Sequence, residues 1–163
     1  MGFFDKKNCT TINIKEFINE YIEGAVIPID LLIELQEKQM QGITSIQIPT
    51  SVVLEIKAKS NAYKYEREAM LKCTKLNNLG IHEEELGNID YAIQIYEDNL
   101  NSSFIAGHSF DRLMILYRKK KDYDNEIRVI NKALDVLCKR HPQLKDKYLK
   151  RLEKAKQLKN NSK

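Results

Sequence analysis

The chain has 163 residues and a net charge of +4, with 42% hydrophobic and 31% charged residues. These values fit about one soluble, folded domain and exclude an extensively disordered chain. No apolar run approaches the ~20 residues that span a bilayer, and the start, MGFFDKKNC, lacks the apolar stretch of a secretion signal. We therefore expect a cytoplasmic protein with no membrane contact.

The residues that usually carry chemistry are scattered. Cys9, Cys73 and Cys138 are far apart and form no C-x-x-C pair, and the three histidines form neither H-x-x-x-H nor H-E-x-x-H. Glycine-rich phosphate loops and the G-x-S-x-G nucleophile turn are missing from the sequence. We therefore expect no metal, no cofactor and no enzymatic activity.

Residues 1–49 are predicted to form a helical hairpin followed by an extended connection. Apolar residues at helical spacing over 12–22 predict a short helix that ends at Gly24, and residues 30–41 predict a second helix that ends at Gly42. The segment ITSIQIP, residues 43–49, alternates only briefly and has no visible pairing partner, so we expect an extended connection.

Residues 50–163 are predicted to form a second, wholly helical domain. No glycine or proline interrupts residues 50–79, and Ser60-Asn61 is the only weak point for a helix. Either one helix runs over about 51–86, or a break near 60–72 separates two helices.

Residues 73–140 contain one pattern twice, 34 residues apart, in copies that cover about 73–106 and 107–140. A fixed period of this length is typical of stacked helix-turn-helix units. The aligned positions are mostly apolar: Leu76 with Phe110, Leu79 with Leu113, Ile89 with Tyr123, Ile93 with Ile127, Tyr96 with Ile130 and Leu100 with Leu134. The pattern predicts helices at about 73–86, 89–102, 107–120 and 123–138, and a basic cap helix over 141–160.

Particular residues of both copies match a known repeat. The first copy has Leu79-Gly80, then Gly87 and Ala92, and the second keeps Leu113 and Ala133-Leu134. In these residues each copy resembles the tetratricopeptide repeat (TPR). The resemblance implies an all-α fold: a right-handed stack of two helical hairpins, with an N-terminal helical segment and a C-terminal cap helix.

Both copies also depart from the repeat's pattern. Met114 stands where glycine is expected, and Glu126 stands where the alanine at the helix crossing is expected. In the first copy Glu83 replaces an aromatic residue and Asn99 replaces an alanine.

The resemblance also implies a binding groove, lined by the first helix of each copy. The lining residues it assigns are Asn77, Asn78, Ile81, Glu84, Glu85, His108, Asp111, Arg112, Ile115, Arg118 and Lys119. Such a groove suits a peptide or protein surface, and Arg112, Arg118 and Lys119 would attract an acidic segment. In the alternative interpretation, Glu84 or Glu85 neutralises Arg118 or Lys119 and the groove has no ligand.

The function expected from these features is a non-catalytic protein-interaction module, an adaptor or regulator. One alternative is a nucleic-acid-associated protein, because residues 139–163 hold ten Lys or Arg against two acids, a net charge of +8. Another is self-association, in which the N-terminal hairpin buries Phe17, Ile18 and Tyr21 against a second copy. The sequence does not decide whether the N-terminal helices fill the groove.

Overall fold

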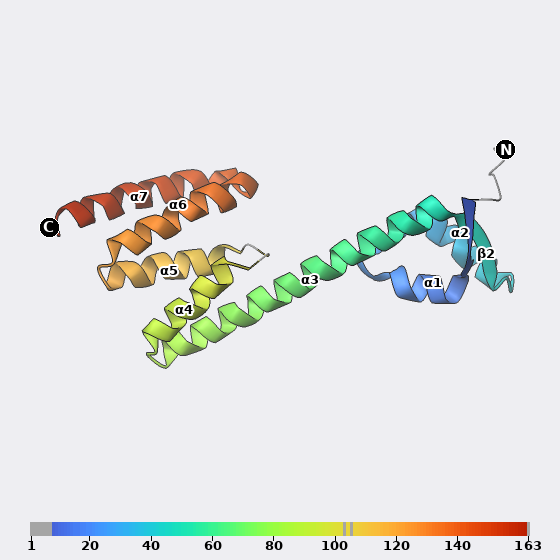
Figure 1. The fold of residues 1–163 in the computed structure, drawn as a ribbon, viewed down its shortest axis with the longest axis horizontal. Helices are drawn as coiled ribbons and strands as arrows, with labels where there is room; N and C mark the ends of the chain where they lie inside the picture. Colours follow the sequence, from blue (N-terminus) through green and yellow to red (C-terminus); the bar gives the residue numbers. More distant parts are fainter. Residues whose placement is uncertain (1–7, 103, 105, 163) are drawn as a thin grey trace. The chain divides into compact units, whose positions relative to one another are not determined.

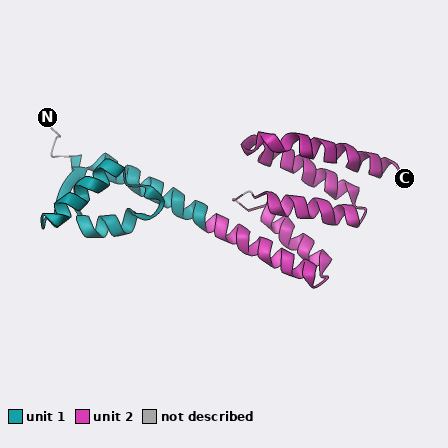
Figure 2. Cartoon of the chain, turned by 180° about the vertical axis from the view of Figure 1, so that it is seen from behind, with its two compact units in different colours: residues 1–67 teal, residues 68–163 magenta. Residues whose placement is uncertain are grey.

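The computed structural model describes residues 8–102, 104 and 106–162, and these are mostly helical, as expected for the all-α class. The chain divides into two compact units, residues 1–67 and residues 68–163, shown in teal and magenta in Figure 2. The long helix α3 (Thr50–Glu85) contributes to both units (Figure 1). It passes through Ser60-Asn61 without a break, so the one-helix alternative is correct.

The first unit pairs two strands that are separated by two helices. Its elements are β1 (Cys9–Asn13), α1 (Ile14–Tyr21), a 3-10 turn η2 (Glu23–Ala25), α2 (Ile29–Met40), β2 (Ser45–Pro49) and the first part of α3. The strands pair antiparallel, with Thr11 opposite Gln47. The expectation of an unpaired connection over 43–49 is therefore wrong. The partner strand lies before α1, too far along the chain for local alternation to reveal it.

The core of the first unit lies where the sheet, α1, α2 and α3 meet. Ile14, Leu35 and Ile56 are almost completely buried there. Phe17 and Tyr21 are also buried, with ring centroids 4.9 Å apart. The chain's own unit therefore covers two of the three side chains that we expected a second copy to bury.

A glycine in η2 lies close against α3 in this unit. Gly24 has a φ of +77°, and a Cβ atom at this position would lie 2.6 Å from Cγ of Tyr63. Glycine is needed here both for the left-handed backbone and for the close approach of the aromatic ring.

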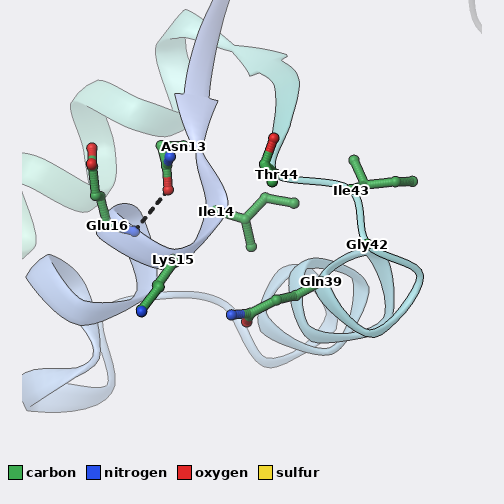
Figure 3. A pocket seen from close by; sticks show the side chains of 8 residues that line it. All are labelled: Asn13, Ile14, Lys15, Glu16, Gln39, Gly42, Ile43 and Thr44. Atoms are coloured by element: carbon green, nitrogen blue, oxygen red, sulfur yellow. Dashed lines mark hydrogen bonds between the residues drawn. The ribbon is translucent and has the colours of Figure 1, made fainter.

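Figure 3 shows the junction of the sheet with α1. A hydrogen bond at this junction identifies which residue pairs of β1 and β2 are hydrogen-bonded. The amide of Ile14 donates to the carbonyl oxygen of Thr44 at 2.9 Å, which extends the ladder one step beyond the strands. The side chain of Asn13 then caps α1 by accepting a hydrogen bond from the Glu16 amide at 3.1 Å, drawn as a dashed line in Figure 3. These residues line a hollow of about 250 Å³ at the end of the sheet.

In the second unit each helix packs on the next one along the chain. After residues 68–85 of α3 come α4 (Ile89–Leu100), α5 (Gly107–Lys119), α6 (Tyr123–Arg140), a 3-10 turn η3 (Pro142–Leu144) and α7 (Lys145–Asn160). Both hairpin turns use one residue in the left-handed region, Gly87 at φ +81° and Lys121 at φ +59°. These two residues are 34 positions apart, so the repeat in the sequence is also a repeat in backbone conformation.

One continuous core joins these helices. Its most deeply buried members come from α4, α5, α6 and α7, and include Tyr96, Leu113, Ile130 and Tyr148. The last helix places Tyr148 and Ala155 on this core, as expected for a cap helix with a narrow apolar stripe.

Candidate functional site

Five of the eleven predicted groove residues line one hollow of about 390 Å³ in the second unit. Three of them come from α3 at positions that share a helix face, and two come from α5, four residues apart. The lining residues are Ile81, Glu84, Glu85, His108 and Arg112. Two helices separated by α4 in sequence therefore contribute to one surface.

An ion pair between α3 and α5 forms one wall of this hollow. Arg112 donates from Nε to Oε1 of Glu84 at 2.9 Å and makes a second bond from Nη2 to Oε2 of the same carboxylate. The hydroxyl of Tyr96 on α4 donates to the same carboxylate at 2.8 Å. The bidentate geometry of this ion pair fixes the distance between α3 and α5 where the two side chains meet.

These contacts shift the pKa values of Glu84 and Tyr96. Burial alone would raise the pKa of the Glu84 carboxyl, but hydrogen bonds from Arg112 and Tyr96 and the charge of Arg112 outweigh burial and hold that pKa below its usual range. Burial, together with the hydrogen bond to Glu84, raises the pKa of the Tyr96 hydroxyl. The carboxylate is therefore held in its charged form and the phenol in its neutral form.

Gly80 and His108 both contact the Tyr96 ring. Gly80 lies directly against it, since a Cβ atom at residue 80 would lie 2.6 Å from Cζ of the ring. His108 meets the ring edge-on, with centroids 5.9 Å apart. Gly80 thus allows the close approach of Tyr96, and the Tyr96 hydroxyl holds the carboxylate of Glu84.

The hollow carries one net negative charge. Glu84 and Glu85 contribute −2 and Arg112 contributes +1. Ile81 supplies the apolar contact, with 37% of its surface exposed.

Asn77 is half-buried and bonds to the buried side chains of Asn99 and Ser109, and Asn78 is exposed on α3. The Asn99 amide nitrogen lies 2.9 Å from Oδ1 of Asn77, 3.0 Å from Oγ of Ser109 and 3.1 Å from the carbonyl oxygen of Cys73. These contacts join α3, α4 and α5. Asn77 is therefore a structural residue rather than a groove contact.

Two further predicted residues are used in packing α7 onto the stack. Asp111 accepts from Nζ of Lys147 at 2.8 Å and from the Tyr148 hydroxyl at 3.3 Å. Arg118 pairs with the fully buried Glu126 of α6, with Nη2 2.7 Å from Oε1. Ile115 is half-buried and Lys119 is exposed. The alternative interpretation has Glu84 or Glu85 neutralising Arg118 or Lys119. The cation bonded to Glu84 is Arg112, and the charge of Lys119 contributes to lowering the pKa of Glu84.

The sequence analysis missed both partners of Glu126, Arg118 and Arg151. Arg151 of α7 donates from Nε to Oε1 of Glu126 at 3.2 Å, so two guanidinium groups share one buried carboxylate. A charged residue at the helix-crossing position was the available signal, because a buried carboxylate needs a cation or hydrogen-bond donors close by.

The basic C-terminal helix is partly neutralised by the stack itself. Lys147, Arg151 and Lys159 pair with Asp111, Glu126 and Asp124. Within the described ranges, no three His, Cys, Asp or Glu side chains are arranged to hold a metal ion. Over the same part of the chain, no helix is both long and apolar enough to cross a membrane.

Comparisons of the chain with models of protein families, with curated proteins and with solved structures give no match.

Proposed function

We propose that the second unit is a non-catalytic protein-interaction module of the TPR-like class, an adaptor or regulator, and that its hollow between α3 and α5 receives a segment of another protein. The observation that carries this proposal is the convergence of Ile81, Glu84, Glu85, His108 and Arg112 on one hollow. The resemblance to the tetratricopeptide repeat assigns these same residues to a groove from the sequence alone. Their convergence supports the register and the groove together.

The chemistry of the hollow favours a segment that combines an apolar side chain with a basic or neutral neighbour. Ile81 offers the apolar contact, and the net charge of −1 disfavours an acidic partner. Of the three cations expected to attract an acidic segment, Arg112 and Arg118 are engaged by Glu84 and Glu126. Lys119 alone is a weak basis for acidic recognition.

The proposed role is non-catalytic because Glu84 and Arg112, two of the ionisable residues of the hollow, are bonded to each other. Glu84 is held in its charged form by Arg112 and Tyr96, so it is poorly suited to exchange protons near neutral pH. The pair serves instead as a rigid wall that presents Ile81 and Glu85 to a ligand.

The proposal is tested by placing a photo-crosslinking amino acid at position 81 in the full chain and irradiating it in native lysate. We expect a covalent adduct with one or a few proteins, identified by mass spectrometry. The matched control places the same amino acid at Leu79, which is 40% exposed on the same helix. Two residues advance a helix by about 200°, so position 79 faces away from position 81.

Adducts that form at position 81 and not at position 79 support the proposal. Adducts that form equally at both positions, or only at position 79, contradict a binding site in the hollow. A nuclease-treated lysate separates direct protein binding from nucleic-acid bridging through the basic C-terminal helix.

A further inference from the structure

The two-stranded sheet of the first unit leaves one edge of β1 open. Among the described residues, β1 pairs only with β2. Hydrogen-bonded pairs alternate along an antiparallel ladder, and the bond from Ile14 to Thr44 marks that pair as hydrogen-bonded. The backbone groups of Thr10 and Ile12 therefore face β2, and those of Cys9, Thr11 and Asn13 face outward.

The outer edge of β2 is protected and that of β1 is not. The same alternation points the backbone nitrogen of Pro49 toward the outer edge of β2, where proline offers no N–H donor. β1 reads CTTIN, with no proline, no charge and three β-branched residues. Of the two edges, that of β1 is the better template for a further strand.

A hollow of about 200 Å³ runs beside this open edge. It is lined by residues of β1, α1 and α3, and by none of β2, so it lies on the free side of β1. Its lining includes the buried side chains of Phe17 and Val53 and the exposed side chains of Glu16, Glu20 and Lys57. An added strand would therefore find both backbone partners and covering side chains.

We propose that this edge binds a second copy of the chain, with the two β1 strands antiparallel about Thr11 to give one four-stranded sheet. The sequence of β1 suits this pairing. In this register Thr11 pairs with Thr11 of the other copy, and Cys9 pairs with Asn13 of the other copy. Thr10 pairs with Ile12 of the other copy, on the face of the sheet that carries the buried Ile12. Every outward-directed backbone group of the strand then meets a partner, and cross-strand pairs of β-branched residues are favourable.

Acidic and basic side chains lie together beside this edge. Glu16 of α1 and Lys57 of α3 line the same hollow. Pairing of the two β1 strands about Thr11 brings the hollows of the two copies to the shared edge, and the proposed dimer pairs Glu16 of one copy with Lys57 of the other.

This inference is independent of the proposed function, since it concerns the first unit alone. It also differs from the self-association expected from the sequence, which relied on Phe17, Ile18 and Tyr21. Phe17 and Tyr21 are covered within one copy, whereas the open strand edge is a surface that the sequence did not predict.

The test is sedimentation equilibrium of the full chain over a wide concentration range, with Thr11→Pro and Gln47→Pro as matched variants. Both prolines remove an N–H that faces away from the β1–β2 ladder, but only residue 11 lies on the proposed interface. We expect a concentration-dependent dimer. Its dissociation constant should rise at least about tenfold in Thr11→Pro and change less than about twofold in Gln47→Pro.

A second experiment reverses the charges of Lys57 and Glu16 and leaves the sequence of both strands unchanged. Lys57→Glu should weaken the dimer through repulsion between like charges, and Glu16→Lys in the same chain should restore part of the affinity. Hydrogen exchange supplies a readout without substitution. The amides of Thr11 and Asn13 should become protected as protein concentration rises, while the Gln47 amide stays unchanged.

A chain that remains monomeric at its highest soluble concentration contradicts the proposal. So does a dimer that Thr11→Pro and Gln47→Pro weaken equally, because the dimer would then depend on the fold of the strand pair and not on the β1 edge. Circular dichroism and thermal unfolding of the two proline variants identify any difference in folding between them.

Discussion

The two hairpins of the second unit share a 34-residue register and fill it differently. In the first hairpin Gly80 on α3 lies against the large ring of Tyr96 on α4. In the second, Met114 stands at the position of Gly80 and Ile130 at the position of Tyr96, and both are fully buried. A small residue with a large one is thus exchanged for two of intermediate size, so the two hairpins reach a close-packed core with different side chains.

The two hairpins also differ at the position where the two helices of each hairpin cross. Ala92 of the first hairpin is fully buried and apolar, and its equivalent in the second hairpin, Glu126, is fully buried and charged. The carboxylate is tolerated because Arg118 and Arg151 both donate to it. A departure from a repeat pattern therefore points to a compensating residue elsewhere.

The largest effect that this comparison predicts comes from restoring the repeat pattern at residue 126. A comparison of the two copies alone would suggest that Glu126→Ala stabilises the fold. We expect it to lower the free energy of unfolding by about 3 kcal/mol, near the lower end for a broken buried ion pair, because both arginines keep some contact with water. Urea unfolding followed by circular dichroism measures it.

Glu85→Ala is the control, since it removes an exposed carboxylate and should change stability by less than about 0.5 kcal/mol. An unchanged or increased stability of Glu126→Ala would mean that the two arginines do not depend on this carboxylate.

The next largest effect tests the close approach of Gly80 and Tyr96. Gly80→Ala adds a Cβ atom inside van der Waals distance of the ring, so we expect a loss of about 2 kcal/mol from overpacking. Gly107→Ala is the matched control, because no atom lies within 4 Å of the added Cβ there. Equal effects of the two substitutions in urea unfolding would show that residue 80 is not tightly packed.

The hairpin turns predict a smaller effect of opposite sign. Lys121 occupies the left-handed region that Gly87 occupies in the first hairpin, and a side chain is strained in this region. Lys121→Gly should raise the free energy of unfolding by about 0.5 kcal/mol, whereas Lys119→Gly, at the last residue of α5, should lower it by about 0.5 kcal/mol. If Lys121→Gly also destabilises, the turn does not hold the conformation described here.

The smallest predicted effect is a dependence on pH. The pKa of Glu84 is lowered in the folded state, so its stabilising contribution is present above the pKa of the unfolded chain and is lost as pH falls through the lower folded value. Glu84→Gln should therefore lose less stability than the original chain between neutral and acidic pH. Parallel loss in both chains, measured by thermal unfolding across this range, would exclude Glu84 as a contributor.

Sequence reasoning succeeded where structure is local or periodic. The helix predicted at 107–120 spans Gly107–Lys119, and the one predicted at 123–138 spans Tyr123–Arg140. It failed at the strand pair, because Cys9–Asn13 and Ser45–Pro49 are short and two helices separate them. Pairing over such a distance leaves no periodic signal in either segment.

The residues of the candidate site were likewise predicted only in part. The repeat register brought Ile81 and Arg112 to one hollow, because positions in a repeat follow helical geometry. It could not assign Arg118 to the buried Glu126, since the choice among several nearby acids depends on side-chain reach and burial. Arg118 is consequently a poor residue for altering the groove, because its removal leaves a buried carboxylate with one fewer cation.

The measurement that most directly tests the account is the affinity of the full chain, with Ile81→Asp and Leu79→Asp variants, for the segment crosslinked at position 81. Loss of the Ile81 contact should raise the dissociation constant at least about tenfold, while Leu79→Asp should leave it within about twofold. Equal weakening by the two substitutions, or no weakening by Ile81→Asp, would contradict a protein-binding site in the hollow between α3 and α5.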